Sequence, residues 1–285
     1  MRHAVTAGLR LSVVVAFAFA TIGAATASAT MNPTFGECKE TPPGAGLFTD
    51  VACTAPGPGS WEAVELKTPA ETMDLEEVEK SSQKFHLGGA FSATVACKKV
   101  TLAKGAKAFG GEPGIVEESR KYEGCSVEHM PGCEINKEAA GKAKITSAPL
   151  VSALVFITKK GAEKKNPEET GMLTNAKAGK GSPLLTFELS GACPGVGKFD
   201  VTGQFLAKNV KAGKHTEKQA VSAPAKRLTK YYFNKEEGKP PKEEAPEPPE
   251  IKLPKGAKLE VIDTGLEVRV CITFQNQRRR WWVIN

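Results

Sequence analysis

The chain has 285 residues, of which 39 are lysine or arginine and 32 are aspartate or glutamate, so its formal net charge is +7. The basic residues form no dense stripe before the last few positions, which argues against nucleic-acid binding. Twenty-eight glycines, nineteen prolines and few aromatic residues favour short strands and many turns over long helices.

The first 29 residues have the features of a secretion signal. Arg2 and Arg10 flank a charge-poor start, an apolar run covers residues 11–20, and small residues lead to Ala27-Ser28-Ala29, an A-x-A cleavage pattern. The apolar run is about half of the roughly 20 residues that a membrane span needs. We therefore expect a secreted or extracellular chain that starts near Thr30, with association with the cell envelope as a further option.

Composition divides the rest of the chain into three parts. Residues 30–233 are predicted to form a disulfide-bonded β domain. Residues 234–258 are rich in Pro, Glu and Lys and are predicted to be an extended or disordered linker. Residues 259–285 are predicted to form a β-hairpin that docks on the main sheet, followed by a basic and aromatic tail.

The first elements of the mature chain lie in a stretch rich in Pro and Gly. Cys38 and Cys53 are predicted to close a small covalent loop, which would restrict the unfolded chain by about 3 kcal/mol. Trp61 is interpreted as a packing anchor, with a platform for stacking a sugar as the alternative. Residues 70–80 are the best helical candidate, and the acidic residues around them lack the spacing and the glycine of an EF-hand loop.

From Lys84 onward apolar residues recur at every second position, which is typical of half-buried strands. Residues 91–97 form one such strand, and Val100 and Leu102 are predicted to begin the next one. Pro149 interrupts the most apolar stretch, residues 143–158, so two consecutive buried strands are predicted there.

Residues 159–181 are polar and rich in turn formers, and a long hairpin loop is predicted there. Residues 185–190 and 199–205 alternate about a Gly- and Pro-containing turn and are predicted to pair as a hairpin. The predicted fold is all-β, an antiparallel sandwich or partly closed barrel of short strands with disulfides and one short helix at most.

Six cysteines precede residue 200 in a chain predicted to be exported, where cysteines usually form disulfides. Six cysteines allow fifteen pairings, and spacing alone does not choose between them. Proximity and strand alternation favour the pairs Cys38–Cys53, Cys97–Cys125 and Cys133–Cys193. The seventh, Cys271, is either a free thiol buried by a neighbouring sheet or the bridge of a covalent homodimer.

Seven features follow one another between residues 32 and 208. They are Phe35-Gly-x-Cys38, Phe48-Thr-Asp-x-x-Cys53, Val95-x-Cys97, Tyr122-x-Gly-Cys125, Cys133, Lys144-Ile-Thr-x-x-x-Leu150-x-x-x-Leu154 and Leu189-x-x-x-Cys193. In this order they resemble a family of uncharacterised secreted proteins from high-GC Gram-positive bacteria. The resemblance implies an exported, disulfide-bonded, β-rich domain and no established activity.

A metal site would rest on Cys125-x-x-x-His129-x-x-x-Cys133. Zinc requires four ligands, or three and a water, and a fourth ligand would have to come from Glu128 or from a distant part of the chain. Pro131 and Gly132 argue against the helix that would place the three residues on one face. We therefore predict disulfides here, with no metal and no cofactor.

No catalytic residue can be assigned from the sequence. The mature chain has His86, His129 and His215 as candidate bases, and no serine lies in a G-x-S-x-G elbow. Residues 178–182 resemble part of a phosphate loop, but Thr174 stands in place of the first glycine of the motif and Gly181 in place of the Ser or Thr that follows the lysine. Enzymatic activity is left open, and a non-enzymatic protein is favoured.

The chain ends in three arginines, Arg278, Arg279 and Arg280, followed by Trp281 and Trp282. Cations beside interfacial aromatic residues suit anionic lipid headgroups or acidic wall polymers, and the alternative is a frayed, inert terminus. The predicted function is therefore an extracellular, non-enzymatic protein that binds a surface partner or an envelope polymer. The alternatives are a secreted hydrolase whose site forms only in three dimensions and a structural component of the envelope.

Overall fold

The computed structural model describes residues 32–51, 53–77, 81–87, 93–103, 105–166, 169–193, 195–210, 218–222, 230–233, 242–246, 250–252, 271–276 and 281–284. The predicted signal segment lies outside the described residues. In the described strands after residue 217, side chains are described only for the segments 230–233 and 242–246.

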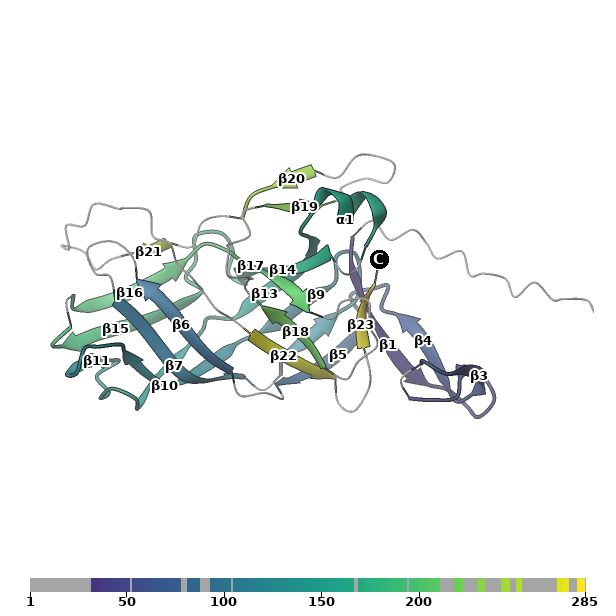
Figure 1. Ribbon diagram of the computed structural model, residues 1–285, viewed down its shortest axis with the longest axis horizontal. Helices are drawn as coiled ribbons and strands as arrows, with labels where there is room; N and C mark the ends of the chain where they lie inside the picture. Colours follow the sequence, from purple (N-terminus) through teal and green to yellow (C-terminus); the bar gives the residue numbers. More distant parts are fainter. Residues whose placement is uncertain are drawn as a thin grey trace, which may run out of the picture.

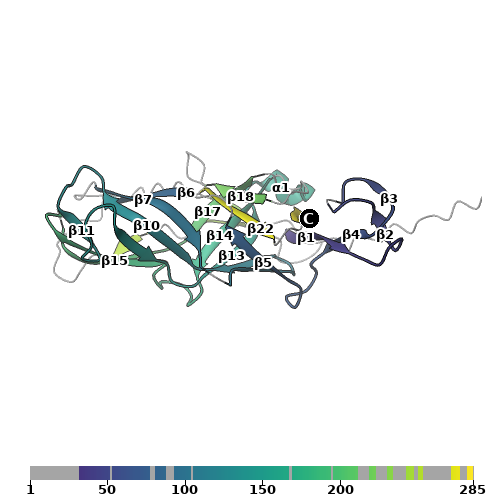
Figure 2. The same ribbon diagram turned by 90° about the horizontal axis from the view of Figure 1, so that it is seen from below.

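The protein is built almost wholly of antiparallel strands, which make up 58% of the structure, against 4% helix. The all-β class, the antiparallel arrangement and the limit of one short helix are confirmed. Figures 1 and 2 show an elongated molecule, with a small sheet at one end, a large curled sheet in the middle and two four-stranded sheets at the other end.

The middle of the molecule is a ten-stranded sheet. Its strand order is β14 (Thr170–Ala176), β17 (Phe205–Val210), β18 (Lys218–Ser222), β22 (Cys271–Asn276), β5 (Thr72–Glu77), β8 (Lys107–Phe109), β9 (Ile115–Glu118), β13 (Leu150–Phe156), β19 (Tyr231–Phe233) and β20 (Lys242–Glu244). Strand β13 pairs with β9 on one edge and with β14 on the other. Strand pairing therefore runs without interruption round the eight strands from β14 to β13.

Two four-stranded sheets make up the far end of the molecule. One has the order β12 (Ala143–Thr146), β10 (Arg120–Val127), β7 (Ala93–Leu102) and β6 (Ser81–Leu87). The other has the order β11 (Cys133–Ile135), β15 (Leu185–Gly191), β16 (Gly197–Thr202) and β21 (Glu250–Lys252). Their buried faces contribute to one hydrophobic core, in which Phe85 meets Tyr122 edge to face and Phe187 stacks on Phe199.

The N-terminal module is the small sheet at the other end. It has the order β23 (Trp281–Ile284), β1 (Thr34–Glu40), β4 (Trp61–Glu65), β2 (Gly46–Phe48) and β3 (Pro56–Gly59). Phe35 anchors the module in the main core, because it is 1% exposed and its ring lies where a side chain at Gly114 would have to be. Burying a whole phenylalanine ring contributes roughly 1.5–3 kcal/mol.

Several predicted elements are confirmed by the strand pairing. Pro149 separates β12 from β13, and the hairpin of residues 185–205 is present as β15 and β16, with Phe205 starting β17. Val100 and Leu102 do not begin a new strand, because β7 continues through them for ten residues while pairing with β10.

The helix predicted at residues 70–80 is wrong. Residues 72–77 form strand β5, in which the buried Met73 and Leu75 alternate with the exposed Asp74. Helix propensity is a weak preference, worth fractions of a kcal/mol per residue, and pairing with β8 and β22 outweighs it.

The loop predicted at residues 159–181 is also wrong. It contains α1 (Lys159–Lys164), which begins after Thr158 and whose Gly161 N–H donates to the Thr158 hydroxyl. It also contains β14, which pairs with β13 along its whole length. The small and hydroxyl-bearing residues buried in β14 conceal its alternation; Thr174, for example, shares a buried hydrogen bond with Ser152.

Two stretches of the predicted linker are paired strands, β20 with β19 and β21 with β16. Residues 271–276 of the C-terminal segment form β22, which pairs with β18 and β5, whereas the rest of the predicted hairpin lies outside the described residues. Residues 281–284 are not frayed, since they pair with β1.

Candidate functional site

The tip of the N-terminal module is closed by the disulfide Cys38–Cys53, which spans 15 residues. Both cysteines are buried, and Phe48 and Trp61 pack against them. The half-buried position of Trp61 beside the disulfide favours the interpretation as a packing anchor over a sugar platform.

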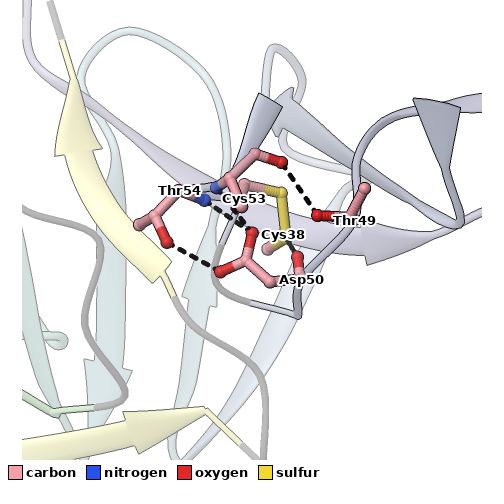
Figure 3. The surroundings of a disulfide bond; sticks show 6 residues. Cys38, Thr49, Asp50, Cys53 and Thr54 are labelled. Atoms are coloured by element: carbon pink, nitrogen blue, oxygen red, sulfur yellow. Dashed lines mark hydrogen bonds between the residues drawn. A yellow bond between two sulfur atoms is a disulfide. The ribbon is translucent and has the colours of Figure 1, made fainter. Parts of the chain in front are cut away.

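Asp50 holds the loop between β2 and Cys53 (Figure 3). Its carboxylate accepts hydrogen bonds from the backbone N–H groups of Thr54 (2.9 Å) and Ala55 (2.8 Å) and from the Thr54 hydroxyl (2.7 Å). Charge-assisted hydrogen bonds of this kind are about twice as strong as neutral ones. The disulfide and the carboxylate together fix the shape of the tip.

The tip presents apolar side chains to solvent. Leu47 is 62% exposed and Val51 is 38% exposed, and Pro56 and Pro58 lie on the outermost strand, β3. Between Thr41 and Ser60, Asp50 is the only ionisable residue. The tip is therefore a rigid, largely apolar surface with Asp50 as its one charged group, and the prolines of β3 lack the N–H groups that would let another strand pair there.

A second cluster of functional side chains lies buried where the middle sheet meets the far end. Arg120 donates from Nε to Glu118 Oε1 at 2.9 Å and also from Nη2, and the two residues are 6% and 5% exposed. Burial lowers the pKa of Arg120, but the Glu118 carboxylate and Tyr122 outweigh burial and raise it. The Ser147 hydroxyl accepts from the backbone N–H of Arg120 at 2.8 Å.

A shallow pocket of about 160 Å³ opens beside this ion pair; we call it the Glu118 pocket. Glu118 and Ser119 line it, with apolar walls from Ala106, Pro149 and Leu150. Glu118 Oε2 is buried and accepts no hydrogen bond from the residues that the structure describes.

Neither cluster was assigned in the sequence, although a signal for the second one is present. Val116, Glu118, Arg120 and Tyr122 lie two residues apart, and all four are buried. Extending the period-two pattern through the charged residues would have placed Glu118 and Arg120 on the inward face. The exposure of Leu47 had no comparable signal, because an isolated apolar residue in a strand is usually buried.

The other two disulfides join Cys97 to Cys125 and Cys133 to Cys193, so all three predicted pairs are confirmed. Cys97 and Cys125 face each other across β7 and β10, and Cys133–Cys193 ties β11 to the residues that follow β15. Because both sulfurs that flank His129 are in disulfides, they are unavailable as metal ligands here. Three disulfides are typical of a protein that matures in an oxidising compartment.

Several predicted site residues are only partly described. The backbone of Trp281 and Trp282 lies opposite Glu37 and Gly36 of β1, whereas Arg278–Arg280 lie outside the described residues. The backbone of Cys271 lies in β22, opposite Ser222. A binding role for the tail and a covalent dimer through Cys271 both stay predictions.

The described part of the chain contains no group of three or more His, Cys, Asp or Glu side chains arranged to hold a metal ion. His129 lies in the turn between β10 and β11, and the side chains of His86 and His215 lie outside the description. Nor do the described residues include a helix long and apolar enough to cross a membrane.

The sequence matches no protein-family model, and neither a curated protein nor a solved structure is significantly similar to it. The resemblance to secreted six-cysteine proteins therefore stays a prediction.

Proposed function

We propose that this chain is an exported, non-enzymatic binding protein that attaches to a protein partner through the tip of its N-terminal module. The observation that carries the proposal is the exposure of Leu47 and Val51 on a loop closed by a disulfide and held by Asp50. Export is supported by the signal-like first 29 residues and by the three disulfides.

Rigidity favours binding through this surface. Ordering a flexible loop on association costs roughly 0.5–1.5 kcal/mol for each side chain that is immobilised. In the tip the backbone is already ordered by folding, because the Cys38–Cys53 disulfide and the hydrogen bonds to Asp50 fix it, so only the side chains remain to be ordered on binding. Leu47 and Val51 are thus presented from a fixed backbone to a complementary surface.

The chemistry of the tip indicates the chemistry of the partner. A surface whose one charged group is a carboxylate offers no positive charge to an acidic polymer or to anionic lipid. It fits an apolar depression on an extracellular protein, and screening by salt should weaken such a contact little. The proposal therefore commits to a protein partner for this site.

The proposal is tested with envelope preparations of the producing organism and fluorescently labelled mature protein. The variant carries Leu47→Ser and Val51→Ser. The matched control is Val196→Ser, since Val196 is 62% exposed and lies between β15 and β16, two strands at the opposite end of the molecule. Burying each tip side chain contributes about 1–2 kcal/mol, so we expect the double variant to lose at least tenfold in apparent affinity.

The control variant should bind like the unmodified protein. Binding should change less than threefold between about 50 and 500 mM salt, over which a contact between opposite charges would weaken strongly. Protease treatment of the envelopes should abolish it. Unchanged binding by the double variant, or binding that survives protease, would show that the tip does not carry the attachment.

A further inference from the structure

The outward face of the sheet formed by β12, β10, β7 and β6, at the far end of the molecule (Figure 1), is rich in lysine. Tyr122 of β10 and Ile145 of β12 point into the core, so their neighbours along each strand point to solvent. Three adjoining strands contribute outward lysines, which we call the basic face: Lys98, Lys99, Lys121 and Lys144. All four are accessible to a ligand, since even the Lys99 side chain is 40% exposed.

The strand register sets the spacing of three of these lysines. Lys99 and Lys144 lie on either side of Glu123 in one row across the sheet, so their backbones are about 10 Å apart. Lys121 lies two residues from Glu123 on β10, about 7 Å along the strand. These spacings are comparable to the distance of about 10 Å over which 0.1 M salt screens a charge. A negatively charged ligand therefore meets the lysines as one positive region.

A β-bulge adds the fourth lysine to this region. Gly124 has a positive φ of 66°, and the register of β10 shifts between Glu123 and Cys125. A Cβ on Gly124 would lie 3.3 Å from Lys98 Cβ, so the stem of the lysine lies across the glycine. Lys98 Nζ ends near Gly141, whose N–H donates to the carbonyl of Cys125. The bulge thus directs Lys98 from β7 across β10 toward β12.

Positive charge exceeds negative charge on the basic face. Lys99 Nζ lies 3.2 Å from Glu123 Oε2, and the hydrogen bond from Lys99, together with the charges of Lys99 and two further lysines, lowers the pKa of Glu123. The other three lysines have no carboxylate within 4 Å among the described residues. Lys84 and Glu128, beside the face, pair with each other at 2.6 Å and add no net charge. Four lysines against one glutamate leave a net charge of +3.

We propose that the basic face binds an anionic polysaccharide, a chain of sugar units that carry carboxylate groups. Its net positive charge is complementary to such a chain, and an extended sheet face can contact several units at once. Thr101 and Thr146 flank Lys121 in one row of the sheet. Their hydroxyl groups can donate to and accept from the hydroxyl groups of a sugar, beside the ammonium group that meets its carboxylate.

The uncharged residues of this face favour a polymer over a lipid surface. Those that point outward on β7, β10 and β12 are small or carry hydroxyl groups: Thr94, Ala96, Thr101, Ser126 and Thr146. Proteins that lie on a lipid surface usually add aromatic or large apolar anchors to their charges. A hydrated polymer needs no such anchor, because charge and hydrogen bonding hold it.

The test is a calorimetric titration of the mature protein with alginate, a polysaccharide whose units all carry a carboxylate. Dextran serves as the neutral comparison, and vesicles of phosphatidylglycerol and phosphatidylcholine serve as the lipid comparison. We expect binding to alginate and no binding to dextran. The affinity for alginate should fall at least tenfold between about 50 and 500 mM salt, because each lysine that contacts the polymer displaces a bound counterion.

Two variants with the same change in net charge separate a site from the overall charge of the protein. The first replaces three exposed lysines of the basic face, Lys98→Gln/Lys121→Gln/Lys144→Gln. The matched control replaces three exposed lysines of α1, Lys159→Gln/Lys160→Gln/Lys164→Gln. The first should lose at least tenfold in affinity for alginate at about 50 mM salt, and the control should change less than threefold. Near-ultraviolet circular dichroism confirms that each variant is folded.

A third variant should strengthen binding. Glu123→Gln removes the one carboxylate of the basic face and raises its net charge from +3 to +4. Affinity for alginate should rise at least twofold at low salt, because repulsion between this carboxylate and those of the polymer is removed. A gain of affinity is a result that loss of structure would not produce.

Each result decides the proposal. A loss in the basic-face variant with retention in the α1 variant supports it, and so does a gain in Glu123→Gln. Equal losses in the two lysine variants, no binding to alginate, or tighter binding to the anionic vesicles than to alginate would overturn it. The tip variant Leu47→Ser/Val51→Ser should bind alginate normally, and the basic-face variant should keep the protease-sensitive attachment. Failure of the proposed attachment function and failure of the polysaccharide site are therefore distinguishable.

Discussion

Replacing Arg120 by methionine should destabilise the protein more than any change in its exposed ion pairs. Methionine keeps an unbranched chain in the same space but removes the guanidinium that faces Glu118. The carboxylate then stays buried with neither of its oxygens bound by a cation. The sulfur-containing chain cannot donate a hydrogen bond to it.

The magnitude follows from the burial of the pair. Glu118 and Arg120 are 5% and 6% exposed, and the arginine donates two hydrogen bonds to one oxygen. Removing one partner of a buried pair costs about 3–5 kcal/mol, since the other charge is left uncompensated. In a chain of this size each kcal/mol lowers Tm by roughly 2–4 °C, so Tm should fall by about 6–20 °C.

The assay is urea unfolding followed by near-ultraviolet circular dichroism with the disulfides intact. The double variant Arg120→Met/Glu118→Gln should be more stable than Arg120→Met alone, because it removes the uncompensated charge as well. Lys177→Met is the control, since Lys177 pairs with Glu117 at the surface, where ion pairs contribute about 0–1 kcal/mol. If Arg120→Met costs no more than Lys177→Met, the reasoning about the buried pair is refuted.

Four further predictions concern the cysteines, the C-terminus and one tyrosine. Intact mass before and after alkylation under non-reducing conditions should show three disulfides and one alkylated thiol at Cys271, or a doubled mass if that thiol bridges two chains. Seven alkylated thiols would contradict the three disulfides. Deleting residues 281–285 removes the strand that pairs with β1 and should cost roughly 2 kcal/mol in urea unfolding; an unchanged midpoint would count against the pairing. Replacing Arg278–Arg280 by serine should weaken sedimentation with anionic vesicles only if the tail is adhesive. Burial and the hydrogen bond to Glu244 raise the pKa of Tyr231. The stability that this shift contributes is complete below the unfolded pKa of about 10 and is lost as the pH rises further. Tyr231→Phe should therefore flatten the fall in Tm between about pH 9 and 11, and an equally steep fall in the variant would refute the reasoning.

The parts of the fold that were predictable are those whose alternation is uninterrupted. The strands around Val95, Phe187 and Phe199 bury an apolar residue at every second position, and the pattern alone predicts them. The prediction failed at residues 72–77 and 170–176 for different reasons. Acidic residues that are good helix formers obscured β5, and small or hydroxyl-bearing residues obscured β14.

The candidate sites were less predictable than the fold, because their function depends on exposure and pairing. Glu118 ends β9 and Arg120 begins β10, and only the packing of neighbouring strands buries both side chains and leaves one carboxylate oxygen without a donor among the described residues. Leu47 has the composition of a core residue, and its exposure arises because the small sheet of the N-terminal module projects from the end of the molecule.

The sequence by itself determined the all-β class, the signal-like start and the favoured pairing of six cysteines, because these depend on local composition, period and separation along the chain. The tertiary structure decided which strands are neighbours, and strands far apart in sequence pair throughout, as β22 does with β5 and β23 with β1. Such pairing is governed by long-range burial, which no local pattern encodes. The same long-range burial places Glu118 against Arg120 in the interior and leaves Leu47 and Val51 exposed, and the exposed pair carries the proposed function.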